Sequence, residues 1–293
     1  MRESGILMHI TSLPGPYGVG TMGKEAYKFV DFMKDAGQRV WQILPLNPTG
    51  YGDSPYQSCS TYAGNHYLID LDTLVEEGLL ENSEIENITW GYREDKVDFG
   101  ALYNNRLKVL RLAYGRFADQ AGLDAFIQEN SSWLPDFALF MALKGKLGGE
   151  PWYRWEHKLK FRDPGAIWQA RQELGEDIRF YSFVQYLFYR QWNALRAYAH
   201  ENEITIIGDV PIYVPYDSVE VWTDPEAFQL DEKLDPVAVA GCPPDAFTAD
   251  GQLWGNPLYR WDVMEKDGFS WWKERMKFCA YHYDVIRIDH FIG

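Results

Sequence analysis

The sequence has 293 residues, of which 46% are hydrophobic and 24% are charged, a composition typical of chains that fold around a core. With 28 Lys and Arg against 43 Asp and Glu residues, the net charge is −15, which argues against nucleic-acid and anionic membrane partners. No apolar run approaches the roughly 20 residues of a membrane-spanning helix, and the N-terminus does not resemble a signal peptide.

The three cysteines, Cys59, Cys242 and Cys279, are odd in number and far apart, with no spacing typical of metal ligands. They predict reduced thiols in a cytoplasmic protein without a structural metal.

The first predicted unit is strand, helix, strand. An apolar run at 5–10 predicts a buried strand, and helical spacing over 24–36, followed by Gly37, predicts a capped helix. A second apolar run at 39–44 ends at Pro45. Short links between these elements imply parallel strands joined by a right-handed crossover.

Residues 66–200 are predicted to be mainly helical, with clear 3.6-residue periodicity over 101–120, 133–146 and 180–200. A third buried strand is expected at 203–209, followed by a Pro- and Gly-rich excursion to about residue 261. A helix at 270–282 and a fourth strand at 284–289 complete the pattern.

Parallel strands separated by helices predict an α/β fold of the (β/α)₈ TIM-barrel type, here with about the first four barrel strands. Residues 1–65 and 201–293 would form the partial barrel, 66–200 a helical insertion after the second strand, and 215–262 a loop-rich subdomain after the third. A doubly wound sheet is the competing fold, but no Gly-rich GxGxxG turn follows any predicted strand.

Two charged residues are predicted to face the barrel interior at the end of the fourth strand. Strand alternation puts Arg287 and Asp289 on one face and Ile286, Ile288 and His290 on the other. A guanidinium beside Asp289 would keep its carboxylate ionised and fit for nucleophilic attack, although a purely structural ion pair is the alternative.

Asp209 ends the third strand in the same way. On chemistry alone it could pair with Asp289 as the two carboxylates of a glycosidase, or it could merely orient Arg287.

Aromatic residues make up 16% of the chain, and two loops after strands combine them with amides and carboxylates. These loops are 51–58 and the segments 241–247 and 252–257. Aromatic faces suit the C–H faces of sugars, while Asp, Gln and Asn bind hydroxyl groups; core packing and ordinary loop packing are the alternatives.

Five segments closely resemble the 4-α-glucanotransferases (amylomaltases, glycoside hydrolase family 77, in the α-amylase clan). In the family's order they are SGILMHITSLPGPYGVG, LPLNPTGYGDSPYQSCSTYAGNHYLIDL, IIGDVPIYVPYDSVEVW, GCPPDAFTADGQLWGNPLYRW and VIRIDHFIG. The resemblance covers roughly the N-terminal half or more of a family member and implies retaining transfer of α-1,4-glucan segments on a (β/α)₈ barrel.

The resemblance also implies roles for individual residues. Asp289 would be the nucleophile with Arg287 beside it, Tyr56 would stack on the sugar next to the scissile bond, and Asp209 would be a supporting carboxylate. Further substrate-binding residues implied in this way are Tyr51, which lines nearby glucan sites, and Asp245, Phe247, Gln252 and Trp254 of an acceptor-side lid.

The family places its acid/base Glu after the fifth barrel strand and a stabilising Asp, with an adjacent His, after the seventh. Because this chain reaches only the fourth, we assign those roles to no residue and expect residues 1–293 alone to be inactive. The expected partners are maltooligosaccharides, amylose and acceptor glucose, with no cofactor or metal. An α-glucan hydrolase and a non-catalytic glucan-binding fragment are the rival hypotheses.

Overall fold

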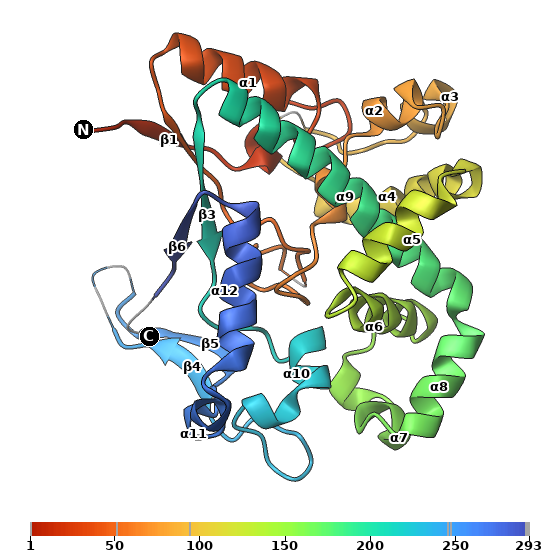
Figure 1. Cartoon of the computed structure of the whole chain (residues 1–293), viewed down its shortest axis with the longest axis vertical. Helices are drawn as coiled ribbons and strands as arrows, with labels where there is room; N and C mark the ends of the chain where they lie inside the picture. Colours follow the sequence, from red (N-terminus) through yellow and green to blue (C-terminus); the bar gives the residue numbers. More distant parts are fainter. Residues whose placement is uncertain (1, 51, 94, 245, 247, 291–293) are drawn as a thin grey trace.

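A four-stranded parallel sheet forms the scaffold of the computed structural model, which describes residues 2–50, 52–93, 95–244, 246 and 248–290. The strands are β1 (Gly5–Leu7), β2 (Val40–Gln42), β3 (Thr205–Val210) and β6 (Val285–Ile288), paired in that order. The registers join Val40 to Thr205 and Asp209 to Arg287. The predicted parallel strands of a partial barrel are therefore confirmed (Figure 1).

Three helices connect these strands: α1 (Lys24–Asp35), α9 (Gly175–Glu201) and α12 (Ser270–His282). In α1 the buried residues Ala26, Val30 and Met33 lie on one helical face. The helix ends as its sequence predicts, because Gly37 takes a φ of 69° and the amide of Gln38 donates to the Met33 carbonyl. These features form a Schellman motif.

The insertion after β2 contains seven α-helices within the described residues, and they gather on one side of the molecule in Figure 1. They are α2 (Leu71–Glu76), α3 (Asn82–Glu86), α4 (Phe99–Arg116), α5 (Gln120–Glu129), α6 (Leu134–Lys146), α7 (His157–Lys160) and α8 (Pro164–Glu173). Aspartate side chains at Asp70, Asp98, Asp119 and Asp163 cap four of the N-termini. The helix predicted over 101–120 ends early, at Arg116, where the backbone of Phe117 becomes extended, and Asp119 caps the start of α5.

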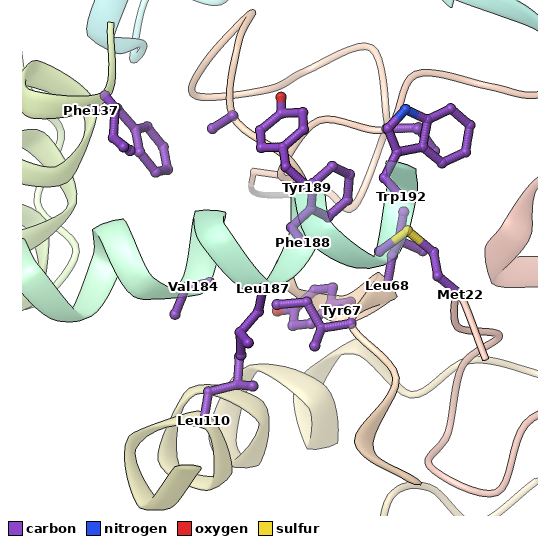
Figure 2. Close-up of a cluster of buried hydrophobic side chains, with 14 of the residues drawn as sticks. Met22, Tyr67, Leu68, Leu110, Phe137, Val184, Leu187, Phe188, Tyr189 and Trp192 are labelled. Atoms are coloured by element: carbon purple, nitrogen blue, oxygen red, sulfur yellow. The ribbon is translucent and has the colours of Figure 1, made fainter. Parts of the chain in front are cut away.

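One hydrophobic core joins the insertion to the scaffold along α9. Figure 2 shows Leu187 of α9 pointing toward Leu110 of α4, and Trp192 of the same helix on the side of Met22, which precedes α1. All of these residues belong to the same buried cluster.

The excursion after β3 is less irregular than its sequence suggests. It contains the helices α10 (Val219–Thr223) and α11 (Trp261–Met264), and an antiparallel pair of strands, β4 (Val239–Cys242) and β5 (Gln252–Pro257). Glycines and prolines in and between these short strands hid them from the period-two pattern.

The first strand is shorter than the predicted 5–10, because the chain turns into a 3₁₀ helix at Ile10–Ser12. Within the described ranges, no helix combines the length and apolar composition needed to cross a lipid bilayer.

Candidate active site

Arg287 joins the ends of β3 and β6. Its Nη1 donates to both carboxylate oxygens of Asp209, at 2.7 Å each, and its Nη2 donates to Oδ1 of Asp289 at 2.7 Å. Parallel pairing makes this contact possible, because the register places Asp209 directly opposite Arg287. Hydrogen bonds to Asp209, and then to Asp289, raise the pKa of Arg287, so the guanidinium stays charged.

The two carboxylates differ in their access to solvent. The Asp209 side chain is only 1% exposed, whereas that of Asp289 is 21% exposed. Asp209 accepts three hydrogen bonds from Arg287 and Tyr56, while Arg287 is the hydrogen-bond donor to the Asp289 carboxylate within the described chain. Asp289 is therefore the more accessible of the two carboxylates, and Asp209 is the one held by Arg287 and Tyr56.

Tyr56 arrives at this site from the loop after β2. Its hydroxyl donates to Oδ2 of Asp209 at 2.8 Å. Burial and the hydrogen bond to Asp209 raise the pKa of Tyr56, so the side chain remains a neutral phenol at neutral pH. The ring is thus held beside the Asp209–Arg287–Asp289 group by a contact that spans 153 residues of sequence.

The β4–β5 sheet reaches the same region through β5. Trp254 donates from its indole nitrogen to Oε1 of Gln252 at 2.9 Å, and its ring lies 4.8 Å from that of His290. Gln57, next to Tyr56, donates to Oδ1 of Asn256 at 3.0 Å. The structure therefore brings Gln252 and Trp254 to the side of the site formed by Asp289 and its neighbour. Tyr51, Asp245 and Phe247 lie outside the described residues.

His290 corrects one expectation. Strand alternation placed it on the outer face with Ile286 and Ile288, but β6 ends at Ile288 and His290 has a φ of 48°. This left-handed conformation breaks the alternation and puts the ring against Trp254, with Nε2 3.7 Å from Oδ2 of Asp289. The sequence signal that could have identified His290 as a residue of the site is its position next to Asp289. No sequence pattern indicated that Gln57 and Asn256 would be hydrogen-bonded to each other.

A cavity of about 1070 Å³ opens elsewhere, between the insertion helices α5 and α6 and helix α12. Tyr62, Trp133, Trp271 and Phe278 contribute to its lining. None of the predicted site residues in the described part of the chain lines it. The carboxylates at the strand ends are therefore separate from this cavity.

Comparisons with known proteins agree with the resemblance of the sequence motifs. A family model described as 4-alpha-glucanotransferase matches residues 8–293. Among curated relatives, the 4-alpha-glucanotransferase of Thermus thermophilus is 50% identical over 100% of this chain and 59% of its own length. That of Clostridium butyricum is 48% identical over 98% of this chain and 59% of its own length. The chain therefore spans about three fifths of the length of these relatives.

Two solved structures of amylomaltases are also similar to this chain. The amylomaltase from Streptococcus agalactiae in complex with acarbose has a TM-score of 0.96 and 48% identity, covering 99% of this chain and 60% of that one. The amylomaltase from Corynebacterium glutamicum has a TM-score of 0.77 at 21% identity, covering 99% of this chain and 41% of that one, which supports the fold alone.

Proposed function

Because this chain belongs to the 4-alpha-glucanotransferase family, we propose that it carries the nucleophile for retaining transfer of α-1,4-glucan segments. The acceptor would be the 4-OH of another glucan or of glucose. The observation that carries the proposal is the solvent-accessible Asp289, paired with Arg287 and backed by the buried Asp209. A barrel-type fold places such groups at the C-terminal ends of its strands.

The proposed reaction has two steps. A carboxylate oxygen of Asp289 attacks the anomeric carbon, the glycosidic C–O bond breaks, and the leaving oxygen takes a proton from an acid. The acceptor 4-OH then attacks the same carbon, loses its proton, and releases Asp289. We assign the acid/base role to no residue of this chain. Carboxylates and hydroxyl groups suffice for this chemistry, so we propose neither a metal ion nor a cofactor.

The sugar-binding roles rest on position and on family resemblance. Tyr56 is held beside Asp289 through Asp209, and Trp254 offers a ring next to His290. Gln252 offers an amide on the same strand as Trp254. Tyr51, Asp245 and Phe247 are proposed from resemblance alone. The acarbose complex of the Streptococcus agalactiae relative supports an α-glucan as the ligand.

The partners, the cellular location and the preference for transfer over hydrolysis are further parts of the proposal. The partners would be maltooligosaccharides, amylose and glucose. All three cysteines are free, which fits a cytoplasmic location. Transfer would outcompete hydrolysis if the segment 241–257 closes over the acceptor and excludes water.

Disproportionation of maltotriose by the full-length protein tests the proposal. We expect Asp289→Asn to abolish release of glucose and longer glucans while maltooligosaccharide binding survives, because an amide cannot form the glycosyl ester. Asp262→Asn is a matched control, since Asp262 is another aspartate paired with an arginine, Arg260, at 2.7 Å. It should retain full activity. Near-normal turnover by Asp289→Asn would refute the proposed nucleophile.

A further inference from the structure

A small cavity of about 30 Å³ lies behind the end of β3, where helices α9 and α12 meet the scaffold. Trp192 of α9 and Arg275 and His282 of α12 contribute to its lining, together with the chain from Asp209 to Pro211. The candidate active site uses none of these three helix residues.

Three of the lining residues each carry a buried nitrogen atom that has no hydrogen-bond partner among the described residues. These atoms are Nε1 of Trp192, Nε of Arg275 and Nδ1 of His282. Their residues are only 1%, 2% and 7% exposed, respectively. Leaving a buried polar group unpaired is costly. The indole and guanidinium N–H groups need an acceptor, and a neutral imidazole nitrogen can donate or accept, so the three together favour a small guest molecule that can do both.

We propose that this cavity is a hydration site that holds one or two water molecules. A buried water needs about 10–15 Å³ and two to four polar partners. The cavity has this volume, and the unpaired nitrogens of its lining residues would supply the partners. Water accepts hydrogen bonds from indole and guanidinium N–H groups. Asn47 and Asp209 are also lining residues, and water could donate to their oxygen atoms, which a halide ion cannot do.

The other hydrogen bonds of Arg275 show how a water molecule in this cavity would stabilise the fold. Nη1 donates to the carbonyl of Ile212 at 3.2 Å and to the hydroxyl of Tyr259 at 3.3 Å, and Nη2 donates to the carbonyl of Pro211. The guanidinium therefore holds the chain just past Asp209. The bound water completes its hydrogen bonding and links α9 and α12 to the end of β3.

Nuclear Overhauser contacts between water and indole N–H groups of the full-length protein test this site. We expect a contact at Trp192, and loss of that signal in Trp192→Phe. Trp41 is the matched control, because it is also fully buried but its Nε1 donates to the carbonyl of Met8 at 2.7 Å. It should show no contact with water.

A crystal structure of the unaltered protein gives an independent answer if Trp192→Phe fails to fold. Water within about 3.2 Å of Nε of Arg275 and Nε1 of Trp192 is the expected result. The proposal is overturned if neither method detects water there. It is equally overturned if crystals soaked in sodium bromide show an anomalous bromide peak in the cavity, since the guest would then be an anion.

Discussion

Asp209 determines the geometry of the candidate active site at the scale of single residues. Its buried carboxylate accepts hydrogen bonds from Tyr56 and from Arg287, and Arg287 in turn contacts Asp289. A hydrogen bond to a charged partner contributes about 1.5–3 kcal/mol. The position of the accessible carboxylate thus depends, through Arg287, on the buried one.

Tyr56→Phe tests this dependence, because it keeps the ring and removes the hydrogen bond to Asp209. We expect kcat/KM of the full-length protein for maltotriose to fall by roughly 10- to 100-fold. Tyr198→Phe is the control, since Tyr198 also donates to an aspartate, Asp31, at 2.6 Å but lies on the outer helices. An unchanged kcat/KM for Tyr56→Phe would show that Asp209 does not need this bond.

The pairing of Arg287 with Asp289 could be predicted from the sequence, because both lie at the end of one strand, two residues apart. The hydrogen bond between Tyr56 and Asp209 could not, since the loop that carries Tyr56 has no periodicity to fix its direction. Strand alternation also predicted the wrong face of β6 for His290, because His290 itself has a left-handed backbone conformation that ends the alternating pattern.

At the scale of elements, Asp284 connects two strands and a helix. Just before β6, it accepts from the backbone N–H of Ile206 at 2.8 Å, from Arg196 at 2.8 Å and from His200 at 2.8 Å. Burial opposes ionisation, but these hydrogen bonds outweigh it and lower the pKa of Asp284 below its ordinary value of 3.8. The ionised form therefore stabilises the junction of β3, β6 and α9.

Asp284→Asn should lower the free energy of unfolding at neutral pH by about 1–3 kcal/mol. A carboxylate with a lowered folded-state pKa stabilises above its unfolded pKa, and this contribution is lost as pH falls through the folded value. The difference from the unaltered protein should thus shrink below about pH 3.8. Urea unfolding over a pH series measures this difference, with Glu25→Gln, a change at a half-exposed carboxylate on α1, as the control. A difference independent of pH would contradict the account.

Trp254 on β5 tests the proposed role of the β4–β5 sheet. An aromatic contact is worth about 0.5–1.5 kcal/mol, so Trp254→Ala should raise the ratio of hydrolysis to transfer by roughly 2- to 10-fold. Trp168→Ala is the control, since Trp168 is an exposed tryptophan on α8. Glucose release from maltotriose with and without added acceptor gives the ratio. If both variants behave alike, Trp254 only packs against its neighbours.

Elements with strong periodicity were predicted well: α12 spans the predicted 270–282, and α1 ends one residue early. The β4–β5 pair was missed because its stability comes from cross-strand pairing and not from a local pattern. Sequence reasoning therefore located the scaffold, but not the sheet that borders the site.

At the scale of the whole molecule, the sheet of the described chain has two edges. β1 pairs only with β2, and β6 only with β3, within the described ranges. The nucleophile proposed at Asp289 follows one of these edge strands. Within the described ranges, the other side of β6 therefore has no partner strand.

Residues 1–293 expressed alone are expected to bind glucans weakly and to show no disproportionation of maltotriose. We assign no general acid to these residues, and a leaving oxygen that is not protonated departs slowly, because general acid catalysis supplies roughly 10²–10⁴-fold in rate. Near-UV circular dichroism establishes that the fragment is folded before the assay. Sustained glucose release at the rate of the full-length protein would mean that a carboxylate within this chain serves as the acid.

Trapping the covalent intermediate tests the central claim most directly. A fluorinated glycosyl fluoride, which slows the second step of retaining enzymes, is incubated with the full-length protein, and the modified peptide is identified by mass spectrometry. We predict one glycosyl group esterified to Asp289. A glycosyl group on another carboxylate, or turnover that leaves every peptide unmodified, would contradict the assignment.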